Sequence, residues 1–159
     1  MKTLNTLIIG SGAAGLAAAV RLNALGVEGI AIYTEGLKMG NSINTGSDKQ
    51  TYYKLGMYGA EPDSPHLLAE DLMRGGSVHG DIALVEAALS PLAFYHLAAL
   101  GVPFPHDEFG QFIGYKTDHD PKRRATSCGP YTSRDMCRAL IREVHQRGIE
   151  VCEKRVAVK

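Results

Sequence analysis

The chain has no tryptophan, few cysteines and no excess of charge of either sign. Lysine and arginine together number 17, as do aspartate and glutamate, so the formal net charge is zero. Nucleic-acid-binding domains normally carry a basic patch or an excess of basic residues, so this balance argues against a nucleic-acid partner. No apolar run approaches the roughly 20 residues that a membrane span requires, and we therefore expect no membrane-spanning segment.

Metal and disulfide chemistry find little support in the sequence. The three cysteines, Cys128, Cys137 and Cys152, are odd in number and lack Cys-x-x-Cys spacing, which argues against a disulfide framework or a zinc site. The six histidines are scattered, and none pairs with another at metal-ligand spacing. We expect no metal, and half-buried hydrophobic positions are the simpler interpretation of the cysteines.

The apolar N-terminus imitates a signal peptide, because Met1 and Lys2 precede an apolar stretch. Glycines interrupt that stretch from Gly10 onward, and Arg21 follows soon after. A buried strand that enters a glycine turn explains the pattern better, and we expect a cytoplasmic protein.

The first third of the chain has the pattern of a β-α-β unit. Leucines and isoleucines predict a strand over residues 3–9, and an alanine-rich apolar face predicts a helix over residues 13–25 that ends at Gly26. A second apolar strand covers residues 30–33. The unit has about the 30 residues that such a motif needs.

Further helices and one more strand are predicted downstream. Ser64 and Pro65 begin a helix that ends near Gly75, because Ser is a good N-cap and Pro suits the first helical position. The remaining predicted features are a loop over 37–59, a helix from Asp81, another from Ser90-Pro91 to Gly101, a short hairpin arm over 111–116, a polar basic loop over 119–130, a helix capped by Thr132 or Ser133, and a strand over 149–158. This order predicts an α/β, Rossmann-like fold with a parallel sheet and covering helices.

The turn between the first strand and helix matches the pattern GxGxxG. The first glycine permits the tight turn, the second lets a pyrophosphate approach the backbone, and the third lets the helix pack close to the strand. The helix N-terminus then favours an anion. The predicted pyrophosphate-binding residues are Gly10, Ser11, Gly12, Ala13, Ala14 and Gly15.

An acidic residue follows the second strand at a suitable distance. Glu35 lies close to the roughly 20-residue offset at which a carboxylate binds the ribose hydroxyls of a dinucleotide. This fingerprint serves both NAD and FAD, and a glycine-rich turn without any ligand is the simplest alternative. The extreme N-terminal position and the alanine-rich helix favour FAD.

The segment after the second strand resembles one flavoprotein family. Gly40-Asn41-Ser42 and Asn44-Thr45-Gly46-Ser47 stand where fumarate reductases, the succinate dehydrogenase flavoprotein subunit and L-aspartate oxidase have the segment that contacts the flavin ring. The similarity continues through Gly75-Gly76, Leu100-Gly101-Val102-Pro103-Phe104 and Arg147-Gly148-Ile149-Glu150-Val151 in the same order. It therefore covers essentially the whole chain.

The resemblance implies FAD-binding roles for further residues. Thr34 and Glu35 would contact the adenosine ribose, and the last strand would offer backbone to the adenine near Val156 and Ala157. The residues implied to run alongside the flavin ring are Asn41, Ser42, Thr45 and Gly46.

Two departures from the family pattern concern this loop. Membrane-bound members tether FAD covalently to a histidine, whereas Ser42 stands at about that place and no histidine precedes His66. We therefore expect non-covalent FAD. Asp48 and Lys49 replace the small residues of the family and would either meet the flavin edge or a substrate, or form a solvated surface turn.

The family's substrate-binding residues lie in a capping domain. The resemblance implies that residues 1–159 are the N-terminal portion of an FAD-binding domain, incomplete by itself, and that the capping domain is absent from this chain. A polar cluster of His119, Lys122, Arg123 and Arg124 offers an arginine pair that could grip a carboxylate, but a solvated basic loop is the simpler interpretation. We therefore assign no catalytic residue.

The sequence thus favours part of a flavin-dependent oxidoreductase that transfers hydride through N5 of FAD. Its expected substrate is a small molecule such as a dicarboxylate, and a partner that donates electrons is compatible with the family. Two alternatives stay open: a truncated nucleotide-binding fragment without catalysis, and an NAD(P)-dependent dehydrogenase.

Overall fold

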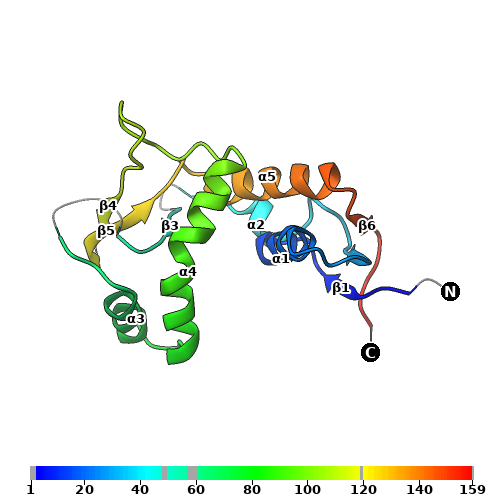
Figure 1. The fold of residues 1–159 in the computed structure, drawn as a ribbon, viewed down its shortest axis with the longest axis horizontal. Helices are drawn as coiled ribbons and strands as arrows, with labels where there is room; N and C mark the ends of the chain where they lie inside the picture. Colours follow the sequence, from blue (N-terminus) through cyan, green and yellow to red (C-terminus); the bar gives the residue numbers. More distant parts are fainter. Residues whose placement is uncertain (1–2, 48–49, 57–60, 119, 159) are drawn as a thin grey trace. The chain divides into compact units, whose positions relative to one another are not determined.

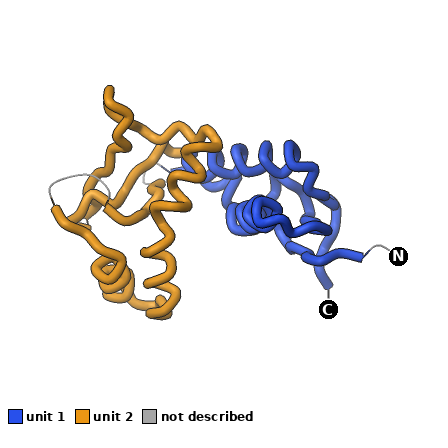
Figure 2. The backbone as a smooth tube through the Cα atoms, viewed as in Figure 1, with its two compact units in different colours: residues 1–48, 131–159 blue, residues 49–130 orange. Residues whose placement is uncertain are grey.

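The computed structural model describes residues 3–47, 50–56, 61–118 and 120–158. The chain forms two compact units (Figure 2). Unit 1 contains residues 1–48 and 131–159, and unit 2 contains residues 49–130. Asp48, Lys49 and His119, which the sequence analysis singled out, lie outside the described residues.

Unit 1 is built around a three-stranded parallel sheet in the order β1-β2-β6. Figure 1 labels β1 and β6 of this sheet and the helices α1, α2 and α5 of the same unit. Ile8 of β1 pairs with Ile32 of β2, and Ile32 in turn pairs with Val151 of β6. The predicted α/β fold with a parallel sheet and helices is confirmed. The elements of unit 1 are β1 (Thr6–Ile9), α1 (Ala13–Ala24), β2 (Ile30–Tyr33), α2 (Asn41–Asn44), α5 (Thr132–Gln146) and β6 (Glu150–Cys152).

The core of unit 1 lies between this sheet and two helices. Helix α1 packs against β1, β2 and α5. Leu16 and Val20 of α1, Ile32 of β2 and Val144 of α5 are fully buried there, because the apolar face of each helix must be removed from water. These buried residues pack α1 and α5 against the sheet.

Unit 2 contains a second sheet, which the sequence analysis missed. This sheet is antiparallel, in the order β3-β5-β4. The predicted basic loop over residues 119–130 is therefore wrong over residues 120–126, which form β5. The elements of unit 2 are β3 (Tyr52–Tyr53), α3 (Pro65–Arg74), α4 (Gly80–Ala99), β4 (Tyr115–Thr117) and β5 (Asp120–Thr126).

Helix α3 begins as its sequence predicts. The Ser64 hydroxyl accepts a hydrogen bond from the Leu67 backbone N–H at 3.2 Å, and Pro65 is the first helical residue. Its buried residues Leu68 and Ala69 pack in one cluster with Ala83 and Ala87 of α4. This cluster holds the two helices together, and Tyr53, Leu55 and Leu72 pack against it.

Helix α4 is continuous where two helices were predicted, so the predicted helix start at Ser90-Pro91 is wrong. Pro91 lies inside the helix and cannot donate to the carbonyl of Ala87. The Ser90 hydroxyl donates to that carbonyl instead, at 2.9 Å, and also accepts from the Leu55 N–H at 2.9 Å. Ser90 therefore replaces the hydrogen bond that proline removes.

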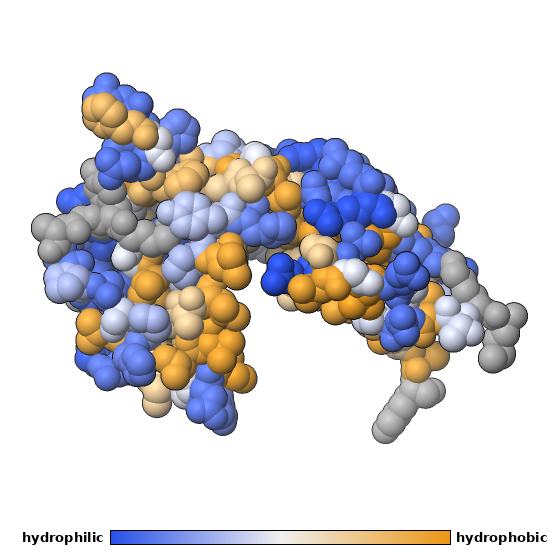
Figure 3. All heavy atoms as spheres, in the orientation of Figure 1, coloured by the Kyte–Doolittle hydropathy of each residue, from blue (hydrophilic) through white to orange (hydrophobic). Residues whose placement is uncertain are grey.

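Helix α4 also qualifies the expectation of no membrane span. By length and composition its 20 residues suffice to cross a membrane, although a core helix of a soluble protein passes the same test. Apolar residues lie on most of its circumference, including Ile82, Val85, Leu89 and Leu92 among the exposed ones. Figure 3 shows apolar side chains gathered along this helix. The absence of a span stays a prediction.

The remaining predicted boundaries shift by a few residues. Helix α5 starts at Thr132, but its N-cap is Tyr131 and neither predicted hydroxyl is the capping residue. The predicted loop over 37–59 contains α2 and β3. The predicted arm over 111–116 is an isolated bridge between His106 and Phe112 followed by the start of β4.

Candidate functional site

A cavity of about 420 Å³ lies in unit 1 where β1 and β2 end. In open parallel sheets, ligands bind outside the carboxyl ends of the strands, which is where this cavity lies. Its lining residues are Ile9, Gly10, Ser11, Gly12, Tyr33, Thr34, Glu35, Met39, Gly40, Asn41, Ser42, Arg155, Val156 and Ala157.

The glycine turn adopts the backbone that its sequence requires. Gly10 has a φ of 97°, a conformation that other residues rarely adopt. A Cβ added to Gly15 would lie 2.4 Å from the Gly10 carbonyl oxygen, so only glycine permits this closeness of helix and strand. A Cβ on Gly12 would make an ordinary 3.4 Å contact with the Ser42 hydroxyl. The protein alone therefore does not require glycine at position 12.

The N-terminus of α1 is suited to an anion. Its N-cap residue, Gly12, makes no side-chain capping hydrogen bond, and the first turn has no acidic residue. The Ala13 N–H donates to the Ser42 hydroxyl at 3.2 Å. Free N–H groups and the helix dipole attract a phosphate at such a terminus.

Ser11 fixes the turn to the end of β2. Its buried hydroxyl donates to the Gly36 carbonyl at 3.0 Å and lies 2.9 Å from the Thr34 hydroxyl. Thr34 is itself buried. Both side chains therefore serve the protein's own hydrogen bonding, while their backbone lines the cavity.

The chain beyond β6 follows the end of β2. Lys154 and Arg155 donate from their backbone N–H groups to the carbonyls of Glu35 and Thr34, at 3.1 and 3.0 Å. This pairing brings Val156 and Ala157 to the cavity beside the exposed Glu35. The predicted strand over residues 149–158 is thus regular only from 150 to 152, but its continuation keeps the predicted position.

Helix α2 forms a further wall of the cavity. Asn41 and Ser42 line it, whereas Thr45 and Gly46 do not. The Ser42 hydroxyl donates a hydrogen bond to the Cys137 sulfur of α5. Burial raises the pKa of Cys137 and outweighs this hydrogen bond, which by itself lowers that pKa. Ser42 therefore connects the glycine turn, α2 and α5.

The structure brings together nine of the predicted site residues, and their contact with a nucleotide stays a prediction. These are Gly10, Ser11, Gly12, Thr34, Glu35, Asn41, Ser42, Val156 and Ala157. Five predicted site residues do not line the cavity. They are Ala13, Ala14 and Gly15, which form the first turn of α1, and Thr45 and Gly46, which follow α2. The sequence analysis missed Arg155, a charged residue that lines the cavity. Its position shortly after strand β6 could have indicated this place.

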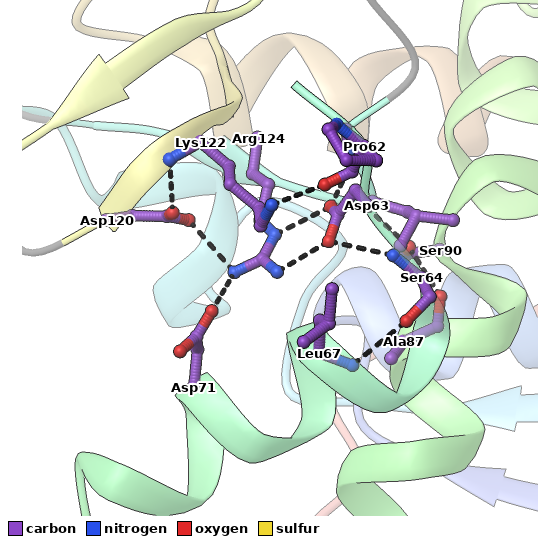
Figure 4. Close-up of polar contacts among 12 residues, drawn as sticks. Pro62, Asp63, Ser64, Leu67, Asp71, Ala87, Ser90, Asp120, Lys122 and Arg124 are labelled. Carbon is purple, nitrogen blue, oxygen red and sulfur yellow. Dashed lines mark hydrogen bonds and ion pairs between the residues drawn. The ribbon is translucent and has the colours of Figure 1, made fainter.

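Unit 2 contains a buried ion cluster around Arg124 (Figure 4). The fully buried guanidinium donates to both oxygens of Asp63, from Nε at 2.8 Å and from a terminal nitrogen at 2.7 Å. Asp71 at 2.7 Å and Asp120 at 3.4 Å complete the cluster. Arg124 does grip a carboxylate bidentately, but that carboxylate belongs to the protein, so the solvated-loop interpretation is wrong for this residue.

Hydrogen bonds and ion pairs in this cluster favour the ionised forms of Asp63 and Arg124. Burial alone would raise the pKa of Asp63, but hydrogen bonds from Arg124 and from the Gly56 and Ser64 N–H groups outweigh burial and hold that pKa below its ordinary value. The same carboxylates raise the pKa of Arg124 against the opposing effect of burial. The cluster joins the start of α3 to β5 and is a structural feature of unit 2.

Comparison with known protein families identifies the chain. The model of a family described as FAD binding domain matches residues 5–159. The chain belongs to this FAD-binding family. The match includes the glycine turn, Glu35 and the chain beyond β6, so the family covers the cavity in unit 1. The family implies FAD as the cofactor of this flavoprotein oxidoreductase domain.

Solved structures of flavoproteins share the fold. Sdh1 of Mycobacterium smegmatis matches 93% of the chain with a TM-score of 0.78 and 21% identity. The quinol fumarate reductase FrdA of E. coli matches 93% with a TM-score of 0.79 and 18% identity. A 3-ketosteroid-Δ4-(5α)-dehydrogenase of Rhodococcus jostii matches 97% with a TM-score of 0.72 and 14% identity.

The chain spans only part of these structures. It covers 27% of Sdh1, 25% of FrdA and 39% of the ketosteroid dehydrogenase. No curated protein matches the sequence significantly. The resemblance to fumarate reductase and succinate dehydrogenase flavoproteins is thus confirmed for the family and the fold of this portion.

Proposed function

We propose that unit 1 binds the ADP half of FAD in the cavity at the ends of β1 and β2, within a flavin-dependent oxidoreductase. One observation carries the proposal: the N-terminus of α1, whose N-cap residue is a glycine, opens on a glycine-lined cavity in a chain of the FAD-binding family. The lining residues fit the pyrophosphate of FAD. The protein's own contacts do not require glycine at position 12, whereas a pyrophosphate that approaches the backbone there requires a residue without a Cβ.

Each wall of the cavity has a role in this proposal. The backbone N–H groups of the glycine turn bind the pyrophosphate, and the Glu35 carboxylate accepts hydrogen bonds from the ribose hydroxyls. Arg155 supplies positive charge to the same cavity, and the backbone at Val156 and Ala157 lies beside the adenine. Asn41 and Ser42 then orient the cofactor where the chain turns into α2.

When bound, FAD supplies hydride transfer at its N5 atom, while the protein supplies binding and orientation. The fold shared with fumarate reductase supports reduction of an activated carbon–carbon double bond in a small dicarboxylate, with oxidation of a carbon–nitrogen bond as the related possibility. We propose that a separate redox partner donates the electrons. A cytoplasmic location belongs to the same proposal.

FAD binding by matched glycine variants tests the proposal. Gly12→Ala adds a Cβ that the fold accommodates but that obstructs the pyrophosphate, so we expect FAD to bind at least about tenfold more weakly, about 1.4 kcal/mol. Gly80→Ala is the control, because it adds the same methyl group at the start of α4, 3.5 Å from the Met73 sulfur. Equal affinity of the two variants for FAD would overturn the proposed site.

Competition and denaturation separate the remaining alternatives. We expect NAD to bind more weakly than FAD, and tighter binding of NAD would favour a dehydrogenase. We also expect acid denaturation to release all flavin into solution, because the binding segment has no histidine before His66. Flavin that stays with the precipitated protein would contradict non-covalent binding.

A further inference from the structure

A second cavity in unit 1 has a strongly cationic lining. Its volume is about 470 Å³, within the range of roughly 300–1,000 Å³ that small-molecule sites occupy. Four cationic side chains line it, from Lys38, Arg134, Arg138 and Arg142. Among the described residues that line it, none is acidic.

Two separate segments build this lining. Arg134, Arg138 and Arg142 follow one another at four-residue spacing on α5, so they lie on one face of the helix. Lys38 comes from the turn before α2. The Asn44 side-chain amide donates to the Lys38 carbonyl at 2.8 Å and to the Gly40 carbonyl at 3.0 Å, which fixes that turn.

Arg134 and Arg138 are oriented by their neighbours and share one carboxylate. The Arg134 guanidinium stacks on the Tyr131 ring at 3.9 Å. One Asp135 oxygen lies 3.3 Å from Arg134 and 3.7 Å from Arg138, so a single carboxylate serves two guanidinium groups. The Arg138 side chain is 56% exposed. Its remaining donors are therefore available to a ligand that enters from solvent.

The cationic cavity and the proposed FAD cavity are lined by different residues of α2. Asn41 and Ser42 line the FAD cavity, whereas Ile43 and Asn44 line the cationic one. The two cavities have no lining residue in common. A pyrophosphate at the glycine turn would therefore occupy a different cavity from the cationic one.

We propose that this cavity binds a small molecule that carries two oxyanion groups, carboxylate or phosphate, at a site separate from the FAD. Guanidinium groups bind both oxyanions through paired, charge-assisted hydrogen bonds. Ile43 and Ile141 offer apolar contact to the part of the ligand between its charged groups. This inference does not rest on the proposed FAD site, because it uses none of that site's lining residues.

Calorimetric titration of the purified protein saturated with FAD tests the site, with malonate and inorganic pyrophosphate as probes. FAD occupies the glycine turn and so prevents pyrophosphate from binding there. The variants are Arg134→Gln and Arg138→Gln, each of which removes one cationic lining group. Arg21→Gln is the matched control, since it removes the same charge from an exposed position on α1.

We expect saturable binding of at least one probe, weakened about tenfold or more by each lining variant and less than twofold by the control. The tighter probe then identifies the ligand as a dicarboxylate or a phosphate compound. The absence of saturable binding of either probe, or equal losses in all three variants, would overturn the inference. A malonate titration without FAD separates the two proposals, because malonate binding in the cationic cavity does not depend on FAD, whereas pyrophosphate then also has access to the glycine turn.

Discussion

Replacing Asp63 with asparagine should remove a large share of the stability of unit 2. The two Asp63 oxygens accept four hydrogen bonds, two from Arg124 and one each from the Gly56 and Ser64 N–H groups. Asparagine offers only one oxygen, so its NH₂ group faces two of these donors in either orientation of the amide. Arg124 stays charged and fully buried.

The expected loss follows from the remaining partners. Breaking a buried ion pair by removing one charge costs about 3–5 kcal/mol. Because Asp71 and Asp120 still neutralise Arg124, we expect the lower end, about 3 kcal/mol of unfolding free energy. Urea denaturation followed by circular dichroism measures this difference at pH 7.

The control and the pH dependence make the test specific. Asp118→Asn removes an exposed carboxylate and should change stability by less than about 0.5 kcal/mol. The pKa of Asp63 lies below its ordinary value. Its contribution is therefore present above the unfolded pKa of about 3.9 and is lost as the pH falls through the folded pKa. Equal stability of the two variants at pH 7 would refute the structural role of the cluster.

Three further substitutions test the hydrogen bonding and packing of each unit by urea denaturation. Gly15→Ala places a Cβ 2.4 Å from the Gly10 carbonyl oxygen and should cost about 1–3 kcal/mol, whereas no loss would contradict the close helix–strand approach. Ser90→Ala leaves the Leu55 N–H and the Ala87 carbonyl without their partner, and a loss below about 1 kcal/mol would be too small for this role. Ser42→Ala removes the acceptor for the first N–H of α1 and should cost about 1 kcal/mol, as loss of an N-cap does.

The sequence predicted the parts of the fold that depend on neighbouring residues. The glycine turn, α1 and β2 follow one another within about 30 residues, so their periodicity and glycines suffice. Ser64 likewise acts on the helix that follows it directly. The nine predicted residues that line one cavity come from this local unit, from α2 and from the chain after β6.

The errors concern residues whose partners are distant in sequence. Arg124 lies 61 residues from Asp63 in the sequence. Without knowledge of that ion pair, its charge indicated a solvated loop. Ser90 lies 35 residues from Leu55, and without that contact Ser90-Pro91 resembles a helix start. The cationic cavity likewise needs Lys38 beside α5, which no local pattern reveals.

Amide chemical shifts measured while FAD is titrated into the isotopically labelled 159-residue chain test the central claim most directly. We expect the largest shifts at the amides of Ser11, Gly12 and Ala13, with further shifts at Glu35 and Val156, and we expect Gly12→Ala to abolish them. Shifts confined to unit 2, or no shifts at saturating FAD, would contradict the claim that the cavity beside β1 and β2 holds the ADP half of FAD.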